Sequence, residues 1–205
     1  QEGSYFDTSF TYSFSYDKRN QTYKPTSGFL SRFNQSLPIV SDGSPILNGY
    51  ELNTYKEIVD DMVVSLSFYG RAINSLSDDD VRISKRLFLP SKKLRGFEAG
   101  KIGPKDSNDY IGGNYSAAVN AATTVPYVFQ TLENLDMKMF LDAANVWGVD
   151  YSDTIDDSNK IRSSFGVAVD WFTVIGPLNF SLSQPITKAG SDKTEKFRFQ
   201  IGTTF

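Results

Sequence analysis

Few side chains of this sequence could carry out covalent chemistry, because its 205 residues include no cysteine and no histidine. A cysteine nucleophile, a histidine base, a Cys/His zinc site and a disulfide framework are therefore excluded. Carboxylates remain, and two runs of them, Asp78, Asp79 and Asp80 and then Asp156 and Asp157, could in principle bind a cation. Their spacing matches no calcium-binding loop, so we interpret both runs as solvated loop residues. We therefore expect no metal site, and these residue types give no indication of an enzyme or a cofactor.

Overall charge and hydropathy limit the kinds of partner and of membrane segment that the chain can have. A net charge of −3 and a pI near 5.0 give no electrostatic reason to expect nucleic acid. The longest uninterrupted apolar run is three residues, for example Met62, Val63 and Val64, whereas a membrane-spanning helix needs about 20. The mean hydropathy of −0.33 is typical of soluble proteins. Transmembrane strands have similar averages, however, because they are apolar only at every second position.

Alternation with a period of two dominates the sequence. Within residues 9–16, Phe10, Tyr12, Phe14 and Tyr16 alternate with serine and threonine, which is typical of a strand with one aromatic and one hydroxyl face. The register of 50–59 is unclear, because both faces carry a charge near its C-terminal end. The pattern predicts no helix and nine strands: 9–16, 28–37, 50–59, 62–69, 114–125, 135–144, 165–171, 178–183 and 197–205.

Alternating strands occur both in soluble sandwiches and in transmembrane barrels. Most of the predicted strands have about 8–12 residues, close to the length that crosses a bilayer. Short turns alternate with longer polar connections along the chain, as in outer-membrane barrels. Aromatic residues also lie toward strand ends on the apolar faces, at Tyr16, Phe68, Trp171 and Phe205. These features favour an all-β, antiparallel transmembrane β-barrel over a soluble sandwich.

A long connection interrupts the strands at about residues 72–110, where alternation fades and charge rises. Connections of this length are usually functional or disordered. It contains Leu94, Arg95, Gly96, Phe97 and Glu98, followed by Ile102-Gly103-Pro104 and by Gly112-Gly113-Asn114. As an ordered set, these residues resemble the conserved loop of the BamA-like outer-membrane protein assembly factors, the bacterial surface antigen family. The resemblance continues upstream at 10–28 and downstream through the last three predicted strands.

The resemblance implies that residues 1–205 are the C-terminal half of a sixteen-strand barrel, with eight or nine strands present. The first strands of that barrel and the N-terminal POTRA domains are absent from this sequence. It also implies that the long connection folds back into the barrel lumen. We therefore expect one transmembrane barrel domain, located in the bacterial outer membrane and in contact with outer-membrane lipid.

For the loop itself, the resemblance implies that Arg95 meets an acidic residue on the barrel wall. Asp142, beside Phe140 on the polar face of its strand, is the partner expected by family position, and a carboxylate can accept the guanidinium fork in two hydrogen bonds. Asp136 and Asp170 are alternative partners for Arg95, because they are also expected to face inward. Family members commonly have a second acidic residue, which aligns with Ala122 here. Without the resemblance, the simplest interpretation of Arg95 is a solvated cation, as we expect for Lys92 and Lys93.

The function that the resemblance implies is assembly and insertion of outer-membrane β-barrel proteins. Client strands would be templated at a seam formed by the terminal strand, with Phe197, Phe199, Ile201, Gly202 and Phe205. Unfolded barrel clients and lipoproteins of the assembly machine would be the partners of the full-length protein. Two alternatives stay open: a two-partner secretion pore of the same superfamily, and a structural barrel fragment that pairs with a copy of itself as a homodimer. An odd count of nine strands favours such pairing, or one strand outside the wall.

Overall fold

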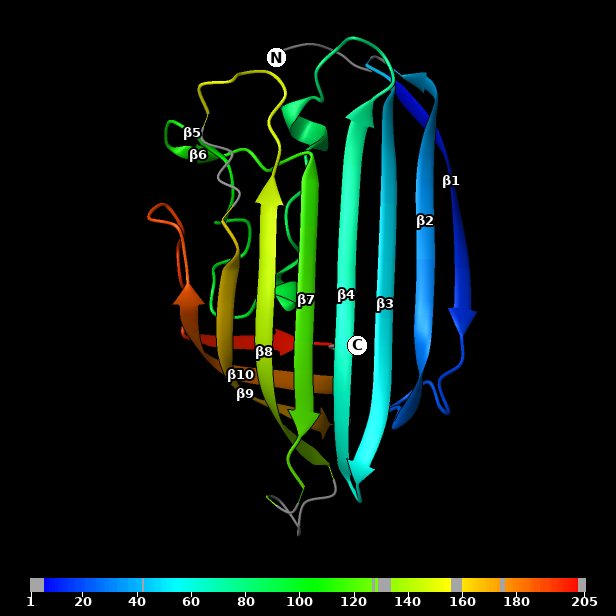
Figure 1. Ribbon diagram of the computed structural model, residues 1–205, viewed down its shortest axis with the longest axis vertical. Coiled ribbons are helices and arrows are strands. Elements are labelled where there is room, and N and C mark those ends of the chain that lie inside the picture. Colours follow the sequence, from blue (N-terminus) through cyan, green and yellow to red (C-terminus); the bar gives the residue numbers. More distant parts are fainter. Residues whose placement is uncertain are drawn as a thin grey trace.

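The computed structural model describes residues 6–41, 43–126, 128, 134–155, 160–173 and 176–202. It contains one antiparallel sheet of nine strands in the order β1-β2-β3-β4-β7-β8-β9-β10-β11, in which each strand pairs with the sheet strands that precede and follow it along the chain (Figure 1). The strands are β1 (Asp7–Asp17), β2 (Ser27–Ser41), β3 (Pro45–Val59), β4 (Met62–Ser75), β7 (Tyr115–Thr124), β8 (Leu135–Trp147), β9 (Arg162–Thr173), β10 (Gly176–Thr187) and β11 (Phe197–Ile201).

The prediction of an all-β chain with nine antiparallel strands is confirmed. Several strands are longer than predicted, because polar residues at their ends continue the backbone ladder. β3 begins at Pro45 rather than at residue 50, and β4 continues to Ser75. The register of β3 is also settled: Lys56 pairs with Val64, and Glu57 pairs with Val63.

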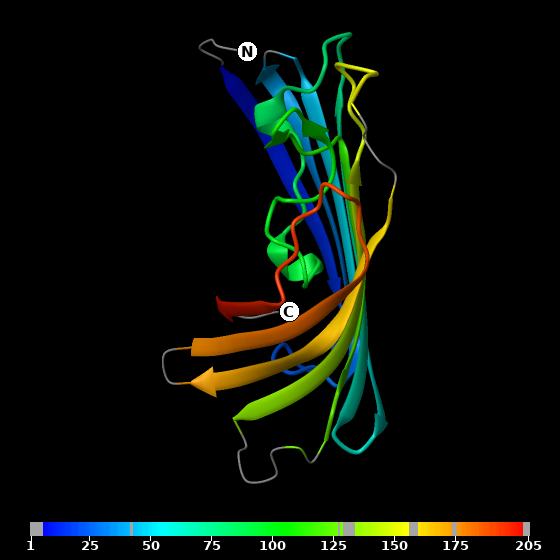
Figure 2. The same ribbon diagram turned by 90° about the vertical axis from the view of Figure 1, so that its left-hand side faces the viewer.

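The sheet curves strongly (Figure 2), and its two faces differ in chemistry. The outer, convex face carries exposed aromatic and aliphatic side chains such as Phe14, Met139 and Trp171. Tyr16 and Trp171 lie near strand ends, as predicted, whereas Phe68 lies in the middle of β4. The inner face carries most of the buried polar side chains of the wall. β1 and β11 form the two edges in the described part of the chain, and all nine strands lie within this one sheet, so the prediction that one strand lies outside the wall is wrong.

The long connection between β4 and β7, residues 76–114, lies on the concave side of the sheet (Figure 2). We call it the motif loop. It contains two single-turn 3-10 helices, η1 (Ile83–Lys85) and η2 (Ser91–Lys93), and a small hairpin formed by β5 (Lys105–Asp106) and β6 (Asp109–Tyr110). Within the described residues, no helix has the length and hydropathy needed to cross a membrane.

Two buried apolar clusters join the motif loop to the inner face of the sheet. Such burial contributes about 25 cal/mol per Å² of apolar surface. The loop is therefore a packed element rather than a solvated connection, and it is positioned by β4, β7 and β8. The larger cluster combines Leu89, Leu94, Phe97 and Ile102 of the loop with Tyr69, Ala118, Ala144 and Val146 of the wall. The smaller cluster combines Val81 and Leu87 with Ile73 and the partly buried Leu47.

Candidate functional site

Arg95, at the tip of the motif loop, contacts Asp142 on the inner face of β8. Its Nε donates to Asp142 Oδ2 at 2.7 Å, and its Nη2 donates to Oδ1 at 2.6 Å. The backbone N–H of Arg95 also donates to Oδ2 at 3.1 Å. This is the two-pronged geometry in which guanidinium and carboxylate match best. The Asp142 side chain has no exposed surface, so the bond forms away from water, where charge pairs are screened least.

Neighbouring side chains on the wall complete the environment of Asp142. Asn120, directly opposite on β7, donates from Nδ2 to Asp142 Oδ1 at 2.9 Å and to the carbonyl oxygen of Lys93 at 2.8 Å. Asn120 therefore holds both the carboxylate and the loop. Ala122, which aligns with a family carboxylate, lies two residues further along β7, opposite Phe140. Asn120 thus supplies a second, uncharged anchor that sequence reasoning missed.

The two competing carboxylates have other partners. Asp136 forms an ion pair with Lys24, in the turn between β1 and β2, at 2.7 Å. Asp170 pairs with Lys138 at 2.6 Å and accepts a hydrogen bond from Asn179 at 2.6 Å. Among the three inward-facing carboxylates considered, the structure places only Asp142 against Arg95.

Phe140 forms the floor beneath the guanidinium. The Arg95 Cζ atom lies 3.4 Å from the centroid of the Phe140 ring, within the range of a cation–π contact. The ring fits because Gly166 lies opposite it on β9. A Cβ atom on Gly166 would be 2.7 Å from Phe140 Cζ and 2.1 Å from the carbonyl oxygen of Leu182.

We expect Asn120→Ala to weaken docking of the motif loop without changing the sheet. The substitution removes hydrogen bonds to Asp142 and to the loop backbone, which we expect to cost about 1–2 kcal/mol. Proteinase K digestion in detergent micelles measures this as faster cleavage within residues 76–114. Asn53→Ala, on the inner face of β3, is the matched control; equal cleavage rates in the two variants would contradict the role of Asn120.

Gly96 and Phe97 follow Arg95 and bring the loop tip close to the wall. Gly96 has φ +89, a conformation that favours glycine. A Cβ atom there would be 3.1 Å from Ser164 Cβ on β9, and the Ser164 hydroxyl donates to the Arg95 carbonyl oxygen at 2.5 Å. Phe97 is only 2% exposed and packs in the larger apolar cluster beside Leu94.

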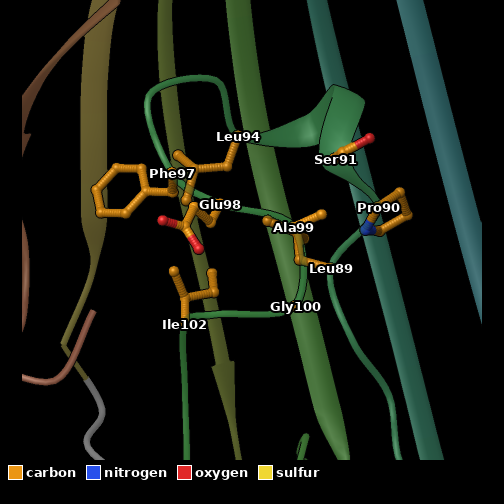
Figure 3. A pocket seen from close by; sticks show the side chains of 9 residues that line it. All are labelled: Leu89, Pro90, Ser91, Leu94, Phe97, Glu98, Ala99, Gly100 and Ile102. Carbon is orange, nitrogen blue, oxygen red and sulfur yellow. The ribbon is translucent and has the colours of Figure 1, made fainter. Parts of the chain in front are cut away.

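A small hollow opens within the motif loop (Figure 3). Its lining comes entirely from the motif loop and includes the exposed Glu98. The hollow therefore lies within the loop and contains none of the wall residues that hold Arg95. Its lining residues are Leu89, Pro90, Ser91, Leu94, Phe97, Glu98, Ala99, Gly100 and Ile102.

Glycines in the other two conserved-loop segments allow backbone contact with the end of β8. Gly103 has φ +92, and a Cβ atom there would be 2.9 Å from Val146 Cβ. A Cβ atom on Gly113 would be 2.3 Å from the carbonyl oxygen of Trp147. The N–H of Asn114 donates to the Gly148 carbonyl oxygen at 2.8 Å. These segments therefore fix the C-terminal arm of the loop to the wall.

The two lysines near the motif differ in environment. Lys92 is exposed, as expected. Lys93 is half-buried, with its Nζ 5.4 Å from the centroid of the Tyr69 ring. Burial lowers the pKa of Lys93. The expectation that Lys93 is a solvated cation is therefore wrong, because the loop turns its aliphatic chain onto the inner wall.

The terminal strand separates its apolar and polar residues between the two faces. Phe197, Phe199 and Ile201 are exposed on the outer face. Gly202 follows β11 with φ +115. Phe205 lies outside the described residues. The polar residue between the two phenylalanines, Arg198, was not predicted as a site residue, although it is buried against the motif loop.

The acidic runs do not form a metal site in the described part of the chain. Asp78, Asp79 and Asp80 are exposed, and no three acidic side chains there converge around a point that could hold an ion. Asp156 and Asp157 lie outside the described residues.

A curved antiparallel sheet with an apolar outer face, a polar inner face and a loop docked inside it defines the wall of a transmembrane β-barrel. The model of the Omp85 superfamily domain matches residues 1–205, the whole chain. The chain belongs to the Omp85 superfamily.

Named relatives agree with this assignment. The chain is similar to the outer membrane protein assembly factor BamA of Neisseria meningitidis, at 32% identity over 139 residues, which cover 55% of this chain and 17% of that protein. It is similar to BamA of Neorickettsia risticii at 27% identity over 201 residues, covering 95% of this chain and 27% of that protein. These relatives are named as assembly factors rather than as enzymes.

A solved structure gives the same result for the fold. The crystal structure of BamA from Haemophilus ducreyi lacking POTRA domains 1-3 superposes with a TM-score of 0.84 at 28% identity, covering 93% of this chain and 41% of that chain. The predicted fold class is therefore confirmed: this sheet is part of a BamA-type barrel, and the family places it in the bacterial outer membrane. The chain spans much less than half of the length of the two relatives above.

Proposed function

We propose that this chain is the C-terminal part of the barrel of an outer-membrane protein assembly factor, which inserts β-barrel clients by templating their strands at a barrel seam. The observation that carries the proposal is the docked loop tip, with Arg95 held on the buried Asp142 by three hydrogen bonds. Membership of the superfamily and the names of the relatives support the kind of function. No bond chemistry and no cofactor is involved.

The mechanism follows from edge pairing in lipid. An unpaired strand edge presents backbone N–H and C=O groups that the bilayer core cannot satisfy. In the described part of the chain, β11 lies at one edge of the sheet and pairs with β10 alone. We infer that this edge separates from its seam partner and then pairs with an incoming client strand by strand addition.

In the same proposal, the motif loop is a lumen element that braces the wall from inside. It contacts β4, β7, β8 and β9, so it holds these strands in one curvature. The partners of the full-length protein would be unfolded barrel clients and lipoproteins of the assembly machine.

Reconstitution tests this function. We expect vesicles that contain the full-length protein to accelerate folding of an unfolded eight-strand client, measured by its heat-modifiable mobility on gels. Vesicles with Arg95→Ala should be slower, and vesicles with Lys92→Ala, an exposed cation of the same loop, should match the wild type. Equal folding rates with wild-type and protein-free vesicles would contradict the proposal. A large, steady conductance in planar bilayers would then favour the secretion-pore alternative.

A further inference from the structure

The inner face of the terminal strand contacts the motif loop through Arg198, which is 7% exposed. Its Nη1 donates to the carbonyl oxygen of Ser91 at 2.5 Å, and its Nη2 donates to the carbonyl oxygen of Phe97. Gln200, on the same face of β11, donates from Nε2 to the Ser91 hydroxyl at 3.0 Å. Ser91 and Phe97 lie on either side of Arg95. The terminal strand thus binds the segment whose tip is docked on Asp142.

The connection that precedes β11, residues 188–196, extends this contact. The N–H of Glu98 donates to the carbonyl oxygen of Lys193 at 3.0 Å, and the N–H of Glu195 donates to the carbonyl oxygen of Gly96 at 3.1 Å. Two strand-like segments therefore lie side by side within the lumen. We call this pair of segments, 96–98 and 193–195, the inner bridge.

A buried ion pair holds the same connection to the wall. Arg162, at the start of β9, donates from Nε to Asp192 Oδ2 at 3.0 Å, and neither side chain has exposed surface. The connection is therefore fixed at Asp192, joined to the loop through the inner bridge, and continued directly into β11. The loop and the terminal strand are mechanically linked by this path.

Arg198 of β11 also contacts this connection directly. Its Nε donates to Glu195 Oε2 at 2.9 Å, so its three donor groups engage the inner bridge and η2 together. If β11 moved alone, a buried guanidinium and two loop carbonyls would lose their partners, and unpaired buried groups of this kind are costly. We propose that Arg198 is a positioning residue that latches the terminal strand to the motif loop, so that β11 leaves the wall only when the latch releases. The inference rests on the proposed function only in taking β11 as the seam strand.

Amide hydrogen exchange of the full-length protein in lipid nanodiscs tests the latch, without any client. In Arg198→Ala, we expect the amides of Glu98 and Glu195 to exchange about tenfold faster, because charge-assisted hydrogen bonds that hold the inner bridge are lost. The Arg95 amide, which is bonded to Asp142, should keep its wild-type rate. Arg32→Ala, which removes an inward guanidinium from β2, should change neither.

Two outcomes would overturn the latch. If the amides of the inner bridge kept their wild-type rates in Arg198→Ala, the contact would hold nothing. If the Arg95 amide accelerated as much as they did, Arg198 would stabilise the whole loop rather than join it to β11. A tether supplies the rescue: with Ser91→Cys and Gln200→Cys joined by a short bifunctional reagent, Arg198→Ala should regain slow exchange. Residues 1–205 contain no native cysteine that would compete for the reagent.

The effect of the tether on client folding distinguishes this inference from the proposed function. In the client-folding assay, the tethered protein should insert clients at least tenfold more slowly than the same protein before tethering, because β11 is then fixed to the loop. If vesicles with wild-type protein fail to fold clients while Arg198→Ala still loosens the inner bridge, the function is wrong and the latch stands. If wild-type vesicles fold clients and tethering has no effect on the rate, the latch does not control the seam.

Discussion

Replacing Asp142 with alanine is expected to release the tip of the motif loop from the wall. The substitution leaves the guanidinium of Arg95 and the amide of Asn120 without their acceptor, and breaking one side of a buried pair costs about 3–5 kcal/mol. Proteinase K should then cut within residues 76–114 at least a hundredfold faster, because each 1.4 kcal/mol corresponds to a factor of ten. Loss of heat-modifiable migration should accompany the cleavage.

The control for this prediction is Asp136→Ala. Asp136 also faces inward on β8, and its ion pair with Lys24 is partly exposed, so its loss should cost less than about 1 kcal/mol. The double variant Arg95→Ala with Asp142→Ala should be less damaged than the sum of the two single variants, because no buried charge is then left alone. An unchanged cleavage pattern in Asp142→Ala would show that the ion pair does not dock the loop.

Substitution of Gly166 by alanine is the second large effect that we expect. Its Cβ atom would meet the Leu182 carbonyl oxygen at 2.1 Å and the Phe140 ring at 2.7 Å. Real Cβ atoms do not approach backbone this closely, so β9 must move from β10 or Phe140 must leave its place beneath Arg95. We expect a loss of about 2–4 kcal/mol in the free energy of unfolding. Urea denaturation in micelles, followed by tryptophan fluorescence, measures it.

Gly190→Ala is the matched control for that experiment. Gly190 lies in the connection between β10 and β11, and a Cβ atom there has no neighbour within 4 Å. Its urea midpoint should equal that of the wild type. In addition, the double variant Gly166→Ala with Phe140→Leu should be more stable than Gly166→Ala alone, because the smaller side chain leaves space for the new methyl group. Equal midpoints for Gly166→Ala and Gly190→Ala would refute the steric argument.

Much of the wall could be predicted from the sequence, because the pleat alone decides which face a residue takes. Once Met139 and Leu141 were assigned to the lipid face, Phe140 and Asp142 had to point inward. The same rule could not choose between Asp142, Asp136 and Asp170, which all face inward. That choice depends on how deep the loop reaches, and depth is a property of the folded loop rather than of the strand pattern.

The contacts that were missed are those in which the backbone is one partner. Arg198 resembles any polar residue between two phenylalanines, and its acceptors at Ser91 and Phe97 are carbonyl oxygens, which every residue has. The role of Gly166 could not be predicted either, because it depends on the close approach of the Phe140 ring. Nothing near Gly166 in the sequence indicates that this ring lies beside it. The end of β3 was ambiguous for a different reason: Lys56 is exposed beyond the packed part of its strand, so its charge carries no information on facing.

The long spacing of the loop contacts has a consequence for the order of folding. Each sheet strand pairs with the next sheet strand of the chain, so the sheet can grow by successive hairpins, and only the pairing of β4 with β7 must close the long motif loop. The motif loop, in contrast, contacts residues that are distant in the sequence. Arg95 and Asp142 are 47 residues apart, and Ser91 and Arg198 are 107 residues apart. Contacts between such distant residues form slowly, because the entropy of chain closure is lost before they contribute. We therefore expect loop docking to be the last and rate-limiting event in maturation of this barrel, completed only after the final strand has been added.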